Sequence, residues 1–248
     1  MTRRSPWIAR LALIVLFVFA WEAAARGFVD KMFLAPPSRV LASLREVLRT
    51  PGVLDALKQT LWELAAAFAL SVALGLAIGL AVGLRAFPRR TFMPVVLLLY
   101  GLPQVTILPL FILYFGIGPA SKIAFGVSHG VFPVILAAVA GVQNLKPILV
   151  LSARAMGATR AQMLRFVVFP HMVPSFFSGL RLAMSGVLLG VLLAELYVSQ
   201  SGIGHFTTLF TQSLEPTKLF GLIGMLAAMA IVLNEIVRRA ETHFSRWR

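Results

Sequence analysis

The sequence of 248 residues contains no cysteine, which excludes disulfide bonds and thiolate metal sites. Histidine is scarce, and its positions show no metal-ligand spacing, so we predict no metal site. The four histidines are His129, His171, His205 and His243.

Motifs for catalysis are also missing. The sequence has no G-x-x-x-x-G-K-[ST] phosphate loop, so we expect this chain to bind neither ATP nor any other cofactor. It has no G-x-S-x-G elbow and no H-E-x-x-H motif. We also expect no pair of carboxylates inside a membrane span. The sequence therefore predicts no catalytic residues and a protein that is not an enzyme.

What the chain does have is apolar sequence: 59% of its residues are hydrophobic, 13% are charged, and the mean hydropathy is +0.88. This composition predicts an all-α membrane protein, because each span needs about 20 mainly apolar residues. We divide the chain into residues 1–58, with the first span and an external amphipathic helix, and a core of five helices at 59–242 around a loop at 143–174. The six predicted spans are 8–27, 59–84, 92–116, 121–142, 175–197 and 217–238.

The placement of positive charge predicts the orientation. The net charge of +14 could suggest nucleic acid, but 15 of the 23 lysines and arginines lie on the side of the termini and the 143–174 loop. The other eight lie on the opposite side, six of them in the connection after the first span. The positive-inside rule therefore places both termini and this loop in the cytoplasm. We expect a multi-pass membrane protein and no nucleic-acid partner; the family resemblance described below implies the bacterial inner membrane.

The first span has a second interpretation. Arg3 and Arg4, with Ala23 to Ala25 further on, resemble the basic end and cleavage site of a signal peptide. The sequence favours an uncleaved span, and an intact mass would decide. The loop at 143–174 stays cytoplasmic in both cases.

After the first span, residues 34–48 start with a proline turn and become an amphipathic helix. We favour a helix that lies on the outer membrane surface; contact with an extracytoplasmic partner is the alternative. Small residues line other spans at four-residue spacing, and we interpret them as packing inside the bundle, with dimer contact as the alternative. The apolar face comprises Val40, Leu41, Leu44, Val47 and Leu48, and the small residues are Ser71, Gly75, Gly79, Gly83, Gly126, Gly130, Gly186 and Gly190.

Candidates for a transport pathway lie where apolar spans contain proline or polar residues. The span at 92–116 should be bent, because proline removes a backbone donor. In lipid such a bend is tolerated mainly against protein or a wet cavity. His129 is either functional or a neutral histidine bonded to a neighbouring span. The candidates are Pro103, Gln104, Thr106, Ser128, His129, Arg181 and Glu195.

Two of these candidates have alternative interpretations. Arg181 lies near the inner end of its span, where it can extend to the interface. Glu195 lies near the outer end, where it lines an outer gate or pairs with Lys122 or Lys218. The residues that follow, 199–214, are too polar to span and predict a glycine turn and a short helix dipping into the outer face. We take Ser201, Gly202 and Gly204 as outer-gate candidates.

The most informative segment is the basic stretch at 151–170, which predicts two short helices around Gly157. Pro147 suits the start of the first helix and Gly157 its left-handed end. Thr159 and Gln162 form a capping box for the second helix, which Pro170 and Pro174 should end. Such a knob, with small residues on its surface, suits a groove on a soluble partner.

The same stretch resembles the "EAA" coupling loop of ABC importer permeases, whose pattern is E-A-A, three residues, Gly, nine residues and I-x-L-P. Ala153, Gly157, Val167 and Pro170 stand at matching positions, whereas Leu151 replaces the Glu and Ser152 the first Ala. From Pro36 to about Glu241 the chain resembles type I permeases of the nitrate, sulfonate and taurine group. Residues 36–41, 109–118, 121–122, 179–183 and 201–204 carry this resemblance.

This resemblance implies that the chain forms the pathway for a small anionic solute, sulfonate-, nitrate- or taurine-like, or for an aromatic or pyrimidine compound. It implies a second permease copy in a homodimer, two ATP-binding cassette subunits that carry ATP and Mg, and a periplasmic or lipid-anchored binding protein. A secondary transporter or channel is the alternative; it would need charged groups at the membrane midplane, where we find only His129. The coupling-loop candidates are Leu151, Ser152, Ala153, Arg154, Met156, Gly157, Ala158, Thr159 and Pro170.

Overall fold

The computed structural model describes residues 6–27, 34–198 and 200–244, and within these ranges the regular structure is entirely helical, as predicted. The predictions for Arg3, Arg4, Lys31, Ser199, Arg246 and Arg248 lie outside them. The helices are α1 (Pro6–Gly27), α2 (Pro37–Arg49), α3 (Val53–Gly83), α4 (Ala86–Gly101), the 3-10 turn η1 (Gln104–Ile107), α5 (Leu108–Phe115), α6 (Pro119–Gln143), α7 (Pro147–Ala155), α8 (Arg160–Gln162), the π-helical η2 (Met163–Val168), α9 (Phe169–Val198), α10 (Ile203–Gln212) and α11 (Pro216–Phe244).

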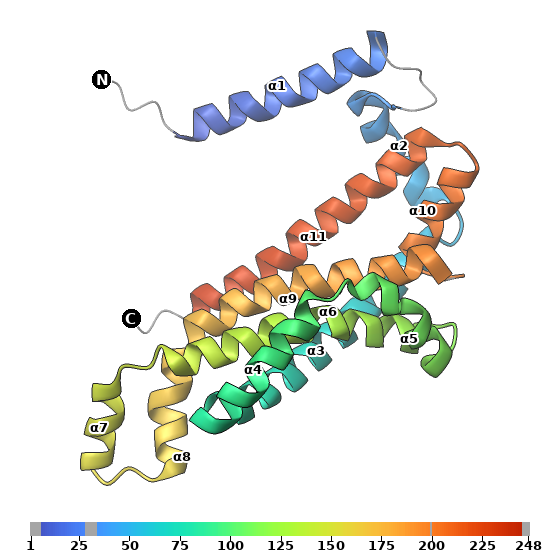
Figure 1. Ribbon diagram of the computed structural model, residues 1–248. Coiled ribbons are helices and arrows are strands. Elements are labelled where there is room, and N and C mark those ends of the chain that lie inside the picture. Colours follow the sequence, from blue (N-terminus) through green and yellow to red (C-terminus); the bar gives the residue numbers. More distant parts are fainter. Residues whose placement is uncertain (1–5, 28–33, 199, 245–248) are drawn as a thin grey trace.

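The long helices run roughly side by side, with a different structure at each end (Figure 1). At one end α7 and α8 project as a hairpin, and we name this the loop end. At the other end lie α2 and α10, and we name this the far end. Five helices in the described residues are long and apolar enough to cross a membrane, and the bent pair of α4 with η1–α5 makes a sixth if counted as one span. The predicted number of spans is confirmed on this count.

The bend in that pair is 84°, and its position follows from proline chemistry. Leu102, directly before Pro103, is extended, with φ −68° and ψ 144°. A residue before proline is pushed out of the helical region because the ring collides with its backbone. The predicted bend in the span at 92–116 is therefore confirmed.

The prediction that Pro170 and Pro174 end a helix is wrong. The chain continues from α8 through η2 into α9 without a break, so the second helix of the loop is the start of a long span. Proline leaves the carbonyl four residues earlier without a donor. The π-helical turn directly before Pro170 has wider i→i+5 bonds, which shift the hydrogen-bonding register where that donor is lost.

Helices α3, α6 and α9 form the centre of the bundle, and small residues let them approach closely. A Cβ built on Gly75 of α3 would overlap Val134 of α6, and one on Gly130 of α6 would overlap Val187 of α9. A Cβ on Gly186 of α9 would overlap the carbonyl of His129. The predicted role of the small residues in internal packing is confirmed.

The amphipathic helix exists as α2, and its place on the outer membrane surface stays a prediction. Its buried side, Val40, Ser43 and Val47, packs on α11, and the Ser43 hydroxyl donates to the carbonyl of Thr217 at 3.1 Å. Leu41, predicted on the same face, is exposed. Buried apolar residues of α2, α3, α10 and α11 form one core at the far end: Val47, Val53, Ala56, Ile203, Phe210 and Leu222.

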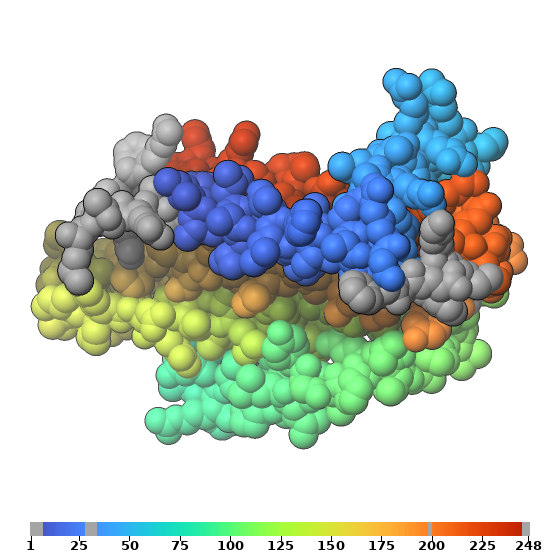
Figure 2. All heavy atoms as spheres, turned by 90° about the horizontal axis from the view of Figure 1, so that it is seen from above, coloured from blue at the N-terminus to red at the C-terminus, as the bar shows by residue number. Residues whose placement is uncertain are grey.

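Helix α1 lies along the outside of the molecule (Figure 2). Most of its side chains, including Trp7 and Phe17, are exposed. One contact to the bundle is the Trp21 ring, whose centroid lies 5.9 Å from that of Phe220 on α11. An apolar helix this exposed has most of its surface left for lipid or another protein.

Candidate functional site

The loop end begins with α7, whose ends are both set by local sequence. Pro147 stands in the first turn, where its missing N–H costs nothing. At the other end the backbone of Gly157 adopts the left-handed conformation, with φ +75°. Its N–H donates to Arg154 O at 3.0 Å, and the N–H of Ala158 donates to Ala153 O at 3.0 Å. This pair of bonds is the Schellman motif, and it confirms the predicted glycine termination.

The second arm of the loop starts as predicted. The Thr159 hydroxyl accepts from the N–H of Gln162 at 3.3 Å, and the Gln162 side chain accepts from the N–H of Thr159 at 2.8 Å. Ala153 is buried. Leu151 and Met156, by contrast, are 65% and 80% exposed. The loop is therefore locally rigid and presents apolar side chains outward, while Pro170 lies back in α9.

A groove of about 620 Å³ separates this loop from the end of α3. Three arginines line it, Arg85, Arg154 and Arg160, and all three side chains are exposed. The other lining residues are small or apolar: Leu84, Ala158, Met163, Leu164 and Val168. The loop end therefore combines exposed cations with exposed apolar surface.

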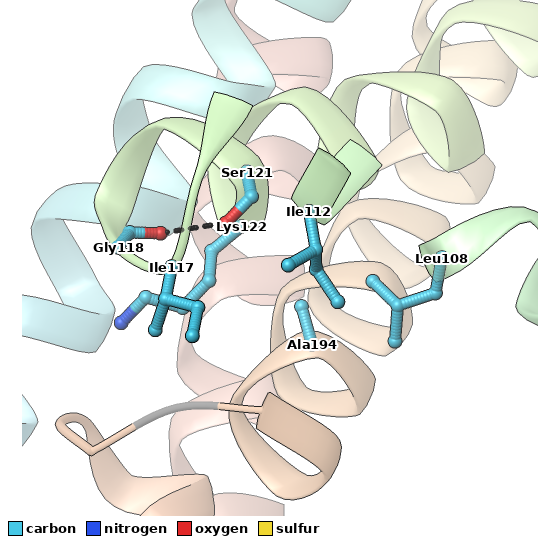
Figure 3. A pocket seen from close by; sticks show the side chains of 7 residues that line it. All are labelled: Leu108, Ile112, Ile117, Gly118, Ser121, Lys122 and Ala194. Atoms are coloured by element: carbon cyan, nitrogen blue, oxygen red, sulfur yellow. Dashed lines mark hydrogen bonds between the residues drawn. The ribbon is translucent and has the colours of Figure 1, made fainter. Parts of the chain in front are cut away.

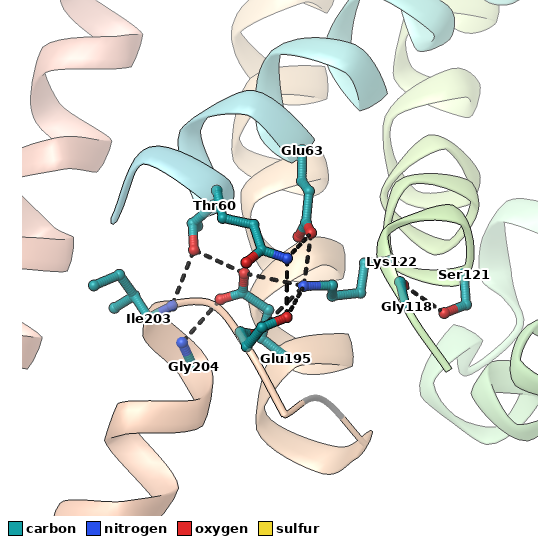
Figure 4. A network of polar contacts seen from close by, with 10 residues as sticks. Thr60, Glu63, Gly118, Ser121, Lys122, Glu195, Ile203 and Gly204 are labelled. Carbon is teal, nitrogen blue, oxygen red and sulfur yellow. Dashed lines mark hydrogen bonds and ion pairs between the residues drawn. The ribbon is translucent and has the colours of Figure 1, made fainter. Parts of the chain in front are cut away.

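The far end contains a buried ion-pair cluster (Figure 4). Lys122 of α6 places its Nζ 2.7 Å from Glu63 Oε1 on α3 and 3.8 Å from Glu195 Oε1 on α9. Both carboxylates are fully buried, and the lysine is 3% exposed. Three spans therefore meet through one buried cation and two buried anions.

The segment leading into α10 completes the cluster. The N–H of Gly204 donates to Glu195 Oε2 at 2.8 Å, and the N–H of Ile203 donates to the Thr60 hydroxyl at 3.0 Å. That hydroxyl donates to Glu195 Oε1 at 2.7 Å. Ser201 accepts from Lys122 through its carbonyl at 3.3 Å and its hydroxyl at 3.4 Å. Polar bonds thus tie α10 to α3, α6 and α9.

Gln59 and Gly202 add two details to this cluster. Gln59 donates to Glu63 Oε1 at 3.0 Å and to the Ser201 hydroxyl at 2.9 Å. Gly202 has φ +96°, and a Cβ built there would overlap the Glu195 carboxylate. Glycine is needed here because the backbone turns directly over a buried charge.

The expectation that no membrane span holds paired carboxylates is wrong, because Glu63 and Glu195 both contact Lys122. The predicted Lys122–Glu195 pair is confirmed, whereas Lys218 pairs with Glu46 and Glu215 at 3.4 and 3.1 Å. Glu63 was missed, although a carboxylate inside the apolar sequence of α3 was a usable signal. The outer-gate candidates Ser201, Gly202 and Gly204 all lie in this cluster.

The pathway candidates do not form one group. Gln104 and Ser128 meet, with 3.2 Å between Gln104 Oε1 and the Ser128 hydroxyl. Half-buried His129 places its Nδ1 3.0 Å from the carbonyl of Phe125 on its own helix, not on a neighbouring span. Thr106 bonds the carbonyl of Pro103. Two further candidates lie elsewhere: Glu195 is in the far-end cluster, and Arg181 pairs with Glu241 on α11 at 3.2 Å.

No group of three or more histidine, cysteine or acidic side chains that could hold a metal occurs in the described part of the chain. Glu63 and Glu195 are only two such ligands, and Lys122 occupies the space between them. The cluster therefore suits charge pairing rather than metal binding.

Comparison with known proteins identifies the family. Residues 71–248 match the model of the binding-protein-dependent transport system inner membrane component. The taurine transport system permease protein TauC of Escherichia coli is 30% identical over 95% of this chain and 87% of its own length. The putative aliphatic sulfonates transport permease protein SsuC of Bacillus subtilis is 28% identical over 99% and 90%.

Solved structures agree on the fold. The MetNI methionine ABC transporter, in an inward facing conformation, superposes with a TM-score of 0.63 over 75% of this chain and 94% of that chain, at 19% identity. Family model, relatives and fold all point to type I ABC importers. The chain therefore belongs to the family of binding-protein-dependent transport system inner membrane components and is an ABC importer permease subunit.

Proposed function

We propose that this permease imports a small sulfonate-like anion through a complex of two permease copies, two ATPase subunits and a binding protein. The names of the relatives, which concern taurine and aliphatic sulfonates, support this substrate class. The homodimer is supported by the unpartnered apolar surface of α1 and of α4–α5, including Phe92, Leu98 and Leu113. ATP and Mg would be held by the ATPase subunits.

The loop end is the proposed ATPase docking site, and the observation that carries this proposal is its construction. A Schellman motif and a capping box hold its backbone, yet the side chains of Leu151 and Met156 are largely exposed. A rigid knob with exposed apolar tips fits a groove on a second protein. Leu151 replaces the glutamate of the family pattern, so docking at this position would be apolar.

The proposed orientation places the loop end in the cytoplasm. Arginines gather there at the ends of α3 and α4 and on the loop: the exposed Arg85, Arg90, Arg154, Arg160 and Arg165, and the half-buried Arg89. Positive charge of this kind favours the cytoplasmic side. The far end, with α2, α10 and the buried cluster, then faces the binding protein.

The proposed pathway runs along the bent pair α4–α5 and the facing part of α6. The pair Gln104–Ser128, with His129 beside it, supplies polar groups there. Because the chain has no cysteine, single cysteines at 104 and 128 can be tested with small polar thiol reagents. A pathway predicts labelling that changes with nucleotide state; uniform protection would contradict it.

The proposed function is tested by reconstitution. The permease should co-purify with its ATPase, hydrolyse no ATP alone, and take up a sulfonate in vesicles only with ATP, ATPase and binding protein. The relation between loop and ATPase is tested with Gly157→Asp, which should stay in the membrane but lose coupling. Uptake by the permease alone, driven by an ion gradient, would overturn the proposal and support a secondary transporter.

A further inference from the structure

The buried ion-pair cluster lies between two apolar cores. On one side is the far-end core of α2, α3, α10 and α11. On the other is a bundle core in which Leu64 and Ala67 of α3 pack on Val187 and Val191 of α9. The boundary between them is polar, unlike the cores themselves. A polar boundary can exchange partners without exposing apolar surface to water.

Lys122 is bound unequally within the cluster. Its Nζ lies 2.7 Å from Glu63 but 3.8 Å from Glu195, and its two contacts to Ser201 are 3.3 and 3.4 Å. The short contact joins α6 to α3, two helices that glycine contacts also hold together. The longer contacts are the ones that reach α9 and the α10 segment.

The cluster also contains a spare acceptor. Glu63 Oε2 is buried and has no hydrogen-bond partner in the described residues. Such a group is costly, since a buried acceptor without a donor loses its hydration and gains nothing. Its presence beside a lysine with long contacts to Ser201 calls for a physical explanation.

There is little free space around the lysine. Its aliphatic chain lines a cavity of only about 10 Å³, with Leu108, Ile112, Ile117, Gly118, Ser121 and Ala194, and Nζ points away from Leu108 and Ala194 (Figure 3). This volume holds at most about one water. When a contact of Nζ is lost, the nearby replacement is therefore another atom of the cluster.

We propose that Lys122, Glu63 and Glu195 form a two-position joint that controls whether α10 lies on the bundle. In the position seen here, Lys122 binds Ser201 and one oxygen of Glu63. In the second position α10 has moved away from α3. The N–H groups of Lys122 that bound Ser201 then donate to Glu63 Oε2 and to Glu195, which has lost its bond from the Gly204 amide. Lys122 is a positioning residue in this account, which rests on the proposed function only for its role in transport.

The exchange replaces part of the buried hydrogen bonding. Departure of α10 removes two acceptors from Lys122, the carbonyl and hydroxyl of Ser201, and one donor from Glu195, the Gly204 amide. It also breaks the bonds from Gln59 to the Ser201 hydroxyl and from the Ile203 amide to Thr60. The lysine then has donors to give, and Glu63 Oε2 and Glu195 Oε2 accept them. A bistable element of this kind is what a gate requires. The turn at Gly202 is where the chain would bend.

The decisive variant is Glu63→Gln. It should make α10 open less often if the cluster is a two-position joint, and more often if the cluster only stabilises the fold. The glutamine carbonyl can keep the contact with Lys122, but an amide NH₂ replaces the spare acceptor, so the second position is lost. The reporter is a single cysteine at Ile203, which is fully buried on α10, in the full permease in nanodiscs without ATPase. Its reaction with a membrane-impermeant maleimide measures how often α10 opens.

The joint predicts that Glu63→Gln slows labelling of Ile203→Cys by about threefold or more, because opening loses its second position. A merely structural cluster predicts the reverse, since weakening a buried ion pair loosens α10 and speeds labelling. Unchanged or faster labelling would overturn the proposal. This measurement uses no ATPase, so its result is independent of whether the proposed transport function is correct.

A disulfide tests the role in transport. Thr60→Cys with Ile203→Cys joins α3 to α10 where the Ile203 N–H meets the Thr60 hydroxyl at 3.0 Å. In the complete complex, oxidation should lower uptake about tenfold and reductant should restore it. The reduced double variant and each single variant are the controls. Full uptake by the oxidised protein, with the disulfide verified by mass, would show that α10 need not leave α3 and would overturn the proposal.

Discussion

The two ends of the molecule differ in how far their positively charged side chains are exposed. At the loop end Arg85, Arg154 and Arg160 are exposed around an open groove. At the far end Lys122 is 3% exposed and lies between two buried carboxylates. An exposed cation contributes little to folding and stays available to another molecule. A buried cation is bound to its own chain, and its loss leaves its partners unpaired.

Apolar side chains are likewise exposed at the loop end and buried at the far end. Leu151 and Met156 at the loop end are exposed, whereas Val53 and Ile203 at the far end are fully buried. The loop end is therefore suited to contact a partner, and the far end is held together by its own residues.

Removing the buried lysine should have the largest effect. Lys122→Met leaves Glu63 and Glu195 without their cation, and breaking a buried pair in this way costs about 3–5 kcal/mol. The unfolding temperature of the purified permease measures the loss. The matched control is Lys218→Met, whose glutamate partners are more exposed, and which should cost less than about 1 kcal/mol. Equal unfolding temperatures for the two variants would contradict the contrast.

Changing the loop glycine should have a smaller effect on stability. In Gly157→Val a β-branched residue must adopt φ +75°, which costs about 1–2 kcal/mol of local strain. No atom lies within 4 Å of a Cβ built there, so the packed core is untouched. Capture of the ATPase should fall about tenfold, whereas Gly157→Asn, which tolerates this conformation, should retain most of it. Equal capture by both variants would show that the glycine backbone does not matter for docking.

Reversing the exposed arginines should leave stability nearly unchanged. The double variant Arg154→Glu/Arg160→Glu changes charges on the surface, where substitutions shift the free energy of unfolding by about 0.5 kcal/mol or less. ATPase capture should nevertheless fall, more steeply at low salt. Arg45→Glu, an exposed change on α2 at the far end, is the control and should capture normally. A large loss of unfolding temperature in the double variant would place these arginines in the fold itself.

The same contrast explains how far sequence analysis could reach. The loop was predictable because its determinants are local: Gly157, Thr159 and Gln162 lie within a few residues of one another and act on their own backbone. The far-end cluster was not, because its bonds join distant helices; Thr60 and Glu195 are 135 residues apart. The Lys122–Glu195 pair was one of several alternatives that the sequence left open for Glu195. Glu63 reaches Lys122 because α3 packs beside α6 in the folded bundle.

Two expectations drawn from local sequence, for helix-breaking prolines and for the amphipathic helix, did not anticipate how these segments pack in the bundle. Pro170 and Pro174 are strong helix breakers in isolation, yet η2 accommodates the first, and α9 continues through both. The apolar face of α2 was recognised, but sequence cannot tell a membrane surface from the side of α11. The order of spans and the presence of a bend within residues 92–116 depended on neighbouring residues alone and were predicted correctly.

Hydrogen–deuterium exchange of the permease, alone and in a nucleotide-free complex with its ATPase, tests the contrast between the ends most directly. The account predicts that amides from Arg154 to Gln162 exchange at least about tenfold more slowly in the complex, because the loop is covered there. The amides of Ile203 and Gly204, already bonded within the chain, should be protected equally in both samples. Loop amides that exchange at the same rate with and without the ATPase would contradict the account.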